Sequence, residues 1–172
     1  MKSLKSKTLS GYKQVSVILE PYLESGPLAA FFLGISSGFP FALIGATLTT
    51  RLAQDGISKS SVTAFALTFL AYNLKPLWAP IVDTTRLPFL AKYGQRRSWL
   101  WFVSFMLTCA IVALGIADPS QALTMVAISA LAVGVFGATL DIIIDAYRIE
   151  LLKSNQLGVG SGMSQYGWRI GA

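Results

Sequence analysis

Residues 27–49, PLAAFFLGISSGFPFALIGATLT, contain no charged side chain. A helix rises about 1.5 Å per residue, so roughly 20 predominantly apolar residues cross a hydrocarbon core of ~30 Å. Because the uncharged run covers the whole circumference of such a helix, an amphipathic surface helix is excluded. The stretch therefore predicts a transmembrane helix, and it sets the fold class for the rest of the chain.

Further apolar runs follow the first one, and only Lys75 interrupts them. We expect an all-α integral membrane protein with four complete transmembrane helices and the start of a fifth. The expected segments are a tail over 1–26, a transmembrane domain over 27–172, and within it helices near 27–49, 60–82, 98–117 and 121–144, with the fifth from about 158. Too few residues remain to finish the fifth crossing, so the sequence predicts a truncated bundle. Pro40, Pro76 and Pro80 should bend the first two helices.

The composition supports a membrane class and excludes several soluble ones. The 172 residues are 53% hydrophobic and 13% charged, and the mean hydropathy is +0.59, whereas soluble domains carry about 25% charged residues. The chain has no histidine and a single cysteine, which removes the usual zinc ligand, the usual general base and any internal disulfide framework. We expect no enzyme, no metal and no cofactor.

The positive charge is explained by topology. The net charge is +6, but with the amino terminus inside, nearly all basic residues outside the helices fall on the cytoplasmic side. Only Arg51 and Lys59 fall on the other. The distribution predicts a multi-pass protein with a cytoplasmic amino terminus, a lipid bilayer as its surroundings, and no nucleic-acid partner.

Charged residues inside the predicted helices are the candidate site. Lys75 lies within the second helix, where charges usually pair or face a water-filled cavity. Asp141 and Asp145 close the fourth helix on one face, and Lys75 or Arg169 can neutralise Asp141 while Arg148 serves Asp145. Two interpretations stay open: a structural ion-pair cluster, and a proton or substrate site.

A second group of charges lies in the loop between the second and third helices. Its members are Asp83, Arg86, Gly94, Arg96 and Arg97. They fit either simple positive-inside charge with a turn glycine, or a latch that joins the loop to an adjacent helix and differs between two transport states.

Several stretches resemble a known family. Residues 75–83 (KPLWAPIVD) with 94–99 (GQRRSW), the fourth-helix ending over 141–147 (DIIIDAY), and residues 160–171 are similar to AmpG-like muropeptide permeases of the major facilitator superfamily. The first helix fits as well, so the resemblance covers about residues 28–172.

The resemblance implies a proton-coupled permease of the bacterial inner membrane that imports GlcNAc–anhydroMurNAc peptides for peptidoglycan recycling. It implies a cytoplasmic gating motif and a polar network near the pathway. The gating motif would comprise Asp83, Gly94, Arg96 and Arg97 with neighbouring Arg86, and the network Lys75, Asp141, Asp145 and Arg169. Family members have two six-helix halves, so the implied partners are the muropeptide and a separately encoded C-terminal half.

Three alternatives remain. One is a non-transporting remnant or membrane interaction fragment. Another is a facilitator for a different polar or CoA-linked substrate. The last is an intramembrane serine hydrolase, since residues 34–38 (GISSG) match a nucleophile pattern around Ser36. No histidine can activate that serine, which leaves only a Ser36–Lys75 dyad.

Overall fold

The computed structural model describes residues 19–88, 92 and 94–172, and every regular element among them is helical. Three helices are long and apolar enough to cross a membrane: Ser25–Gln54, Gln95–Ile116 and Leu123–Leu151. The predicted tail over 1–26 lies mainly outside the described residues; its last part, 19–23, is helical. The all-helical membrane fold is therefore confirmed, with three such helices rather than four.

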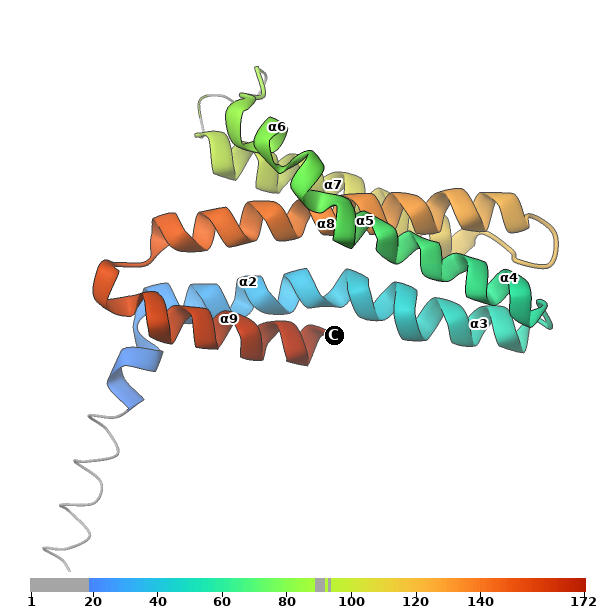
Figure 1. Cartoon of the computed structure of the whole chain (residues 1–172), viewed down its shortest axis with the longest axis horizontal. Coiled ribbons are helices and arrows are strands. Elements are labelled where there is room, and N and C mark those ends of the chain that lie inside the picture. Colours follow the sequence, from blue (N-terminus) through green and yellow to red (C-terminus); the bar gives the residue numbers. More distant parts are fainter. Residues whose placement is uncertain (1–18, 89–91, 93) are drawn as a thin grey trace, which may run out of the picture.

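The first span is one rod built from three helical segments, α2 (Ser25–Ala42), the π-helical η1 (Leu43–Leu48) and α3 (Thr49–Gln54) (Figure 1). Pro40 lies inside α2 and has no N–H to donate to the preceding turn. The π-helical turn follows within three residues, as expected where a normal helical ladder is interrupted. The helix nevertheless continues and ends five residues beyond the predicted boundary.

The helix predicted over 60–82 is not regular, because this region is a chain of short helical segments. Pro76 and Pro80 withhold two backbone donors, and the Thr68 hydroxyl donates to the Phe65 carbonyl at 2.6 Å, which competes with the helical ladder. The segments are α4 (Lys59–Ala64), η2 (Phe65–Phe69), α5 (Leu70–Leu74), η3 (Lys75–Leu77) and α6 (Ala79–Thr84).

The later helices are close to the prediction, with one consequential difference. They are α7 (Gln95–Ile116), α8 (Leu123–Leu151), the short η5 (Ser154–Gln156) and α9 (Leu157–Gly171). Because α8 runs seven residues past the predicted end at 144, Asp141 and Asp145 lie within the helix rather than closing it. Their carboxylates are therefore positioned by continuous helix on both sides.

Helix α8 is the centre of the bundle. Its side chains Val126, Ala130, Val133 and Ile143 have no exposed surface. Figure 1 shows α8 between α7 on one side and α2 on the other, with α4, α5 and α6 running across them, and the contacts between these elements agree. A mostly buried central helix can hold a charged group only if the elements packed on it supply partners.

Helices α2 and α9 lie side by side and approach unusually closely (Figure 1). A methyl group at Gly34 or Gly38 would overlap backbone oxygens of α9, and one at Gly167 or Gly171 would overlap backbone oxygens of α2. Small residues on both faces thus permit backbone-to-backbone packing, which is a main source of helix association in lipid.

Each end of the bundle has an arginine that joins neighbouring helices. At one end, called the Arg51 end, the Arg51 guanidinium donates to the carbonyls of Leu114 and Ala117 at 2.9 and 2.7 Å. A cation at the carboxyl end of α7 also complements the helix dipole. Nearby, hydrogen bonds from Ser120 hold the pKa of the Asp118 carboxyl below its ordinary value. The opposite end, where α6 and α8 finish and α7 begins, is called the Arg96 end.

The close approach of α2 and α9 predicts different effects for two glycine substitutions in the same helix. Gly167→Ala places a methyl group against the Phe31 carbonyl, and overpacking of this kind costs about 1–3 kcal/mol. At Gly162 an added methyl group meets no atom within 4 Å. In thermal unfolding of the purified chain, Gly167→Ala should lower the melting temperature, whereas Gly162→Ala should not lower it. Equal effects would contradict the close packing.

Candidate functional site

An ion pair joins the broken helical region to the central helix. Lys75 begins η3, directly after α5 ends, and its Nζ lies 2.5 Å from Oδ2 of Asp141 in α8. The other oxygen, Oδ1, accepts a hydrogen bond from the Ser37 hydroxyl of α2. Both oxygens of the carboxylate are thus engaged, and α2, η3 and α8 meet at one group. The side chain of Asp141 is only 18% exposed.

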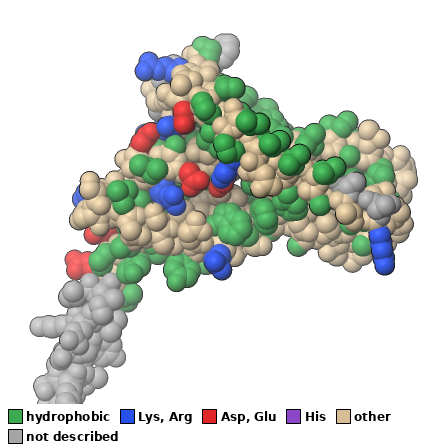
Figure 2. All heavy atoms as spheres, viewed as in Figure 1, with side chains coloured by type: hydrophobic (Ala, Val, Ile, Leu, Met, Phe, Trp, Pro, Cys, Tyr) green, Lys and Arg blue, Asp and Glu red, His purple; other side chains and the backbone are tan. Residues whose placement is uncertain are grey.

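A second carboxylate lies one helical turn along α8. Oδ2 of Asp145 is 3.9 Å from the Lys75 ammonium, and Oδ1 is 3.3 Å from a guanidinium nitrogen of Arg148. The predicted local pairing of Asp145 with Arg148 is therefore present. Two acids and two bases alternate through the cluster, so its formal charges cancel. Figure 2 shows acidic and basic side chains next to one another between apolar surfaces on this face.

These groups line a cavity of about 280 Å³ between α2, α5, α8 and α9. Its polar side chains are Ser37, Tyr72, Lys75, Asp141, Asp145, Ser164 and Gln165. Phe41, Ile144 and Trp168 supply apolar surface. A cavity with charged groups on one side and aromatic rings on the other is suited to an amphipathic ligand or to ordered water.

An aromatic cluster borders the charged groups. The Phe41 ring lies 4.7, 5.6 and 5.4 Å, between ring centroids, from the rings of Phe69, Tyr72 and Trp168. The Tyr72 hydroxyl is buried and has no hydrogen-bond partner among the described residues. A buried hydroxyl without a partner is costly, so this group is available to a ligand or water in the cavity.

The structure selects one of the two cations expected opposite Asp141. Lys75 forms the ion pair, whereas Arg169 in α9 is exposed and makes no ion pair with any residue in the described ranges. Sequence reasoning did not identify Ser37 or Tyr72 as site residues. A signal existed for Tyr72, since it precedes Lys75 by three residues and so lies on the same helical face. Ser37 is recognisable only once α2 is packed on α8.

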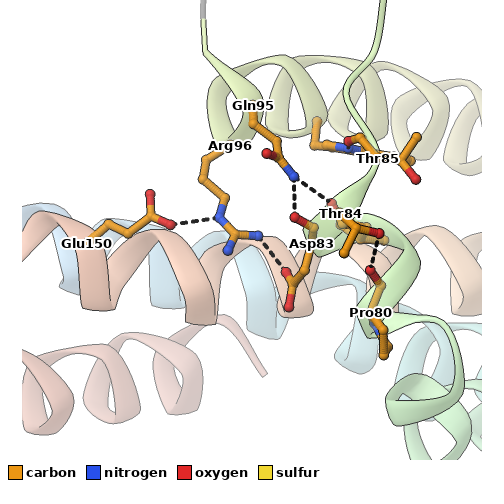
Figure 3. A network of polar contacts seen from close by, with 9 residues as sticks. Pro80, Asp83, Thr84, Thr85, Gln95, Arg96 and Glu150 are labelled. Atoms are coloured by element: carbon orange, nitrogen blue, oxygen red, sulfur yellow. Dashed lines mark hydrogen bonds and ion pairs between the residues drawn. The ribbon is translucent and has the colours of Figure 1, made fainter.

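The Arg96 end carries a separate polar network (Figure 3). The Arg96 guanidinium lies 2.5 Å from the Asp83 carboxylate at the end of α6 and 2.9 Å from the Glu150 carboxylate in α8. The Gln95 side-chain amide donates to the Asp83 backbone carbonyl, and the Trp99 indole N–H donates to the Thr85 carbonyl at 2.8 Å. One arginine therefore ties α6, α7 and α8 together, and Glu150 is a member that the sequence did not indicate.

The remaining residues of the predicted loop motif take other positions. Gly94 has φ +89°, a conformation that favours glycine, and it precedes the first residue of α7. Arg86 and Arg97 are exposed and form no ion pair with the residues that the structure describes. Within that same part of the chain, no three acidic or cysteine side chains gather closely enough to hold a metal ion.

The predicted serine nucleophile is in ordinary helix. Ser36 lies in the middle of α2, and its hydroxyl donates to the Phe32 carbonyl one turn earlier at 3.2 Å. The only base proposed for it, Lys75, is engaged by Asp141. The arrangement does not resemble the strand-to-helix turn that exposes such a serine in hydrolases.

Comparison with known proteins identifies the family. The family described as Acetyl-coenzyme A transporter 1 matches residues 28–172. The chain belongs to this family. Its members are transporters of the major facilitator type rather than enzymes, so the expected absence of enzymatic activity and the resemblance to AmpG-like permeases are both confirmed.

Individual relatives cover most of the chain but a smaller part of their own length. The chain is 36% identical over 141 residues to "Putative transporter AmpG 4" of Rickettsia felis, which is 82% of this chain and 34% of that protein. It is 34% identical over 139 residues to "Anhydromuropeptide permease" of Escherichia coli K12, which is 81% of this chain and 28% of that protein. The chain thus spans about a third of the length of such relatives.

The two-sided contact of Arg96 predicts different results for neighbouring arginines. Arg96→Lys leaves a single ammonium that cannot reproduce the fork to both Asp83 and Glu150, whereas Arg97→Lys changes an exposed group without an ion pair. Exposed pairs contribute ~0.2–1 kcal/mol each. In denaturant titrations, Arg96→Lys should lower the unfolding midpoint measurably and Arg97→Lys should not; a lower midpoint for Arg97→Lys alone would contradict the network.

Proposed function

We propose that the chain provides part of the substrate pathway of a proton-coupled secondary transporter. One observation carries the proposal: the Lys75–Asp141 ion pair, with Ser37 on the second carboxylate oxygen, lines a cavity of about 280 Å³ inside a membrane helix bundle. Charged groups in such a position are functional by default. In this proposal the 59–84 region is the second of four crossings, followed in α9 by the start of a fifth.

The ion pair supplies a physical basis for coupling. A proton on Asp141 removes the negative charge and leaves the Lys75 ammonium without its nearest partner, at 2.5 Å. The helices that meet at the carboxylate then lose the attraction that holds them together, and the equilibrium shifts toward a second arrangement. Asp145, at 3.9 Å from the same ammonium, is positioned to take over Lys75 when Asp141 is neutral.

The Arg96 network fits a gate at one end of this pathway. Asp83 lies at the end of the broken region, in α6, and a separation of α6 from α7 would break its contact with Arg96. Glu150 offers Arg96 an alternative partner on α8. We propose the Arg96 end as the cytoplasmic side, because the basic residues that flank the predicted helices lie mostly there.

We propose cell-wall muropeptides as the substrate, with transport across a bacterial inner membrane. The similarity to a protein named anhydromuropeptide permease supports this choice. The family's description names acetyl-coenzyme A instead, which makes a CoA thioester the second candidate. The cavity lining suits a part of either class, since both combine polar or charged groups with rings that can pack on Phe41 or Trp168.

Uptake measurements test the proposal. The 172-residue chain is expressed in cells that lack their own anhydromuropeptide permease, both alone and joined to the remaining length of the E. coli permease that it does not match. Membrane insertion is confirmed first. Labelled anhydromuropeptide should enter in at least one arm, an uncoupler should abolish the uptake, and Asp141→Asn should reduce it at least about tenfold, as expected when a proton site is lost.

Gly162→Ala serves as a matched control because it changes a helix residue that meets no neighbour. Labelled acetyl-coenzyme A is offered in parallel, and its uptake alone would transfer the proposal to the second substrate. Insertion without uptake of either compound in both arms would contradict the transport proposal and favour a non-transporting remnant.

A further inference from the structure

Arg169 carries a charge in the part of α9 that would lie deep in the membrane, where a helix that faces lipid rarely carries one. It lies twelve residues after Leu157, the first residue of α9, which is about 18 Å along the helix. Helix α9 begins next to the Arg96 end, so this depth is near the centre of a hydrocarbon core of ~30 Å. Neither interface is close enough for the side chain to reach with its charged end, and an unpaired arginine at this depth costs about 2.5–3.5 kcal/mol.

The structure supplies no countercharge for this arginine. Its side chain is exposed and forms no ion pair or hydrogen bond with any residue of the described ranges. The two acids that line the cavity already have partners, since Lys75 and Arg148 balance Asp141 and Asp145. Among the described residues, Arg169 is therefore a positive charge without a countercharge.

Arg169 lies next to the cavity through its neighbours on α9, although its own side chain is not part of the cavity lining. Ser161, Gln165 and Arg169 follow one another at intervals of four, so they share a helical face, and all three are exposed. Gln165 and the neighbouring Trp168 line the cavity. Gly160 and Gly167 lie on a different, buried face, and Gly167 packs against α2, whereas the buried Ser164 also lines the cavity. A stripe of exposed polar side chains at membrane depth indicates a water-filled path rather than lipid.

We propose that Arg169 is the anion-binding residue of this path, and that its guanidinium holds a carboxylate or phosphate group of the substrate. The inference rests on the proposed function, because it takes the cavity side of α9 as the substrate route. A guanidinium fork matches the two oxygens of either anion and keeps its charge under all conditions. Gln165, one turn earlier, can hydrogen-bond to the adjoining polar part of the substrate, while Trp168 and Phe41 contact its apolar part.

A guanidinium in this position selects the charge of the substrate but not its chemical class. A peptide carboxylate of a muropeptide and a phosphate of a CoA thioester have the same fork geometry. Because the Lys75 cluster is neutral, Arg169 supplies the net charge that an anion requires. The competing occupant of this position is an acidic side chain from another protein segment or a second copy.

Binding of matched charged and uncharged probes tests the assignment. The 172-residue chain is reconstituted in lipid nanodiscs and titrated with S-acetyl-4′-phosphopantetheine and S-acetylpantetheine, which differ only in the phosphate, and with an anhydromuropeptide and its carboxyl-amidated form. At least one charged probe should bind about tenfold more tightly than its uncharged counterpart. The pair that shows the difference identifies the source of the anion.

Variants of Arg169 test whether this residue causes the difference in affinity between the charged and the uncharged probe. Arg169→Gln should abolish the preference for the charged probe while leaving the uncharged probe unaffected, and Arg169→Lys should keep part of it. Lys59→Gln, which removes an exposed cation at the Arg51 end, should keep all of it. If Arg169→Gln does not fold, Arg169→Lys decides: it should weaken the charged probe only.

The outcomes separate this inference from the proposed function. Equal binding of charged and uncharged probes, or an unchanged preference in Arg169→Gln, overturns the role of Arg169 while the cavity remains a binding site. An unchanged preference together with an altered oligomeric state assigns Arg169 to an acid of another protein segment. Binding of no probe by the folded wild-type chain contradicts the proposed function itself.

Discussion

The contact on which the rest of the structure depends is the ion pair between Lys75 and Asp141. Asp141 belongs to α8, the most buried helix, and it binds η3 through Lys75 and α2 through Ser37. In lipid such a carboxylate persists only with partners, so its presence fixes how three elements meet. The same contact explains why the 59–84 region can be broken without separating from the bundle. Broken helices that line a cavity are tolerated at membrane depth because polar groups there find partners.

Two other constraints determine what surrounds this contact. Backbone contact between α2 and α9, permitted by Gly34, Gly38 and Gly167, brings Trp168 and Gln165 to the cavity beside Ser37. At the Arg96 end, a single guanidinium holds α6 against α7 and α8. The interior pair and the end network lie on the same broken region, whose short segments move more easily than a continuous helix.

The sequence predicted the long helices well because an uncharged run in lipid has few alternatives to a helix. It predicted that prolines would disturb the 60–82 region, but not the break at Phe65–Phe69, which depends on the Thr68 hydroxyl returning to its own backbone. It named Lys75, Asp141 and Asp145 because charges stand out in apolar runs, yet left Lys75 and Arg169 as equal partners for Asp141. It did not predict the contacts of Ser37 and Glu150, since these depend on which helix faces pack together. Gating and proton coupling remain proposals.

A double-mutant cycle on Lys75 and Asp141 tests the central claim most directly. The free energy of unfolding in micelles is measured for the wild type, Lys75→Met, Asp141→Asn and the double variant. If the two side chains form the pair that organises the bundle, each single change destabilises the protein and the double change costs less than their sum, with a coupling energy of about 1 kcal/mol or more. Additive losses, with no coupling between the two sites, would contradict the account.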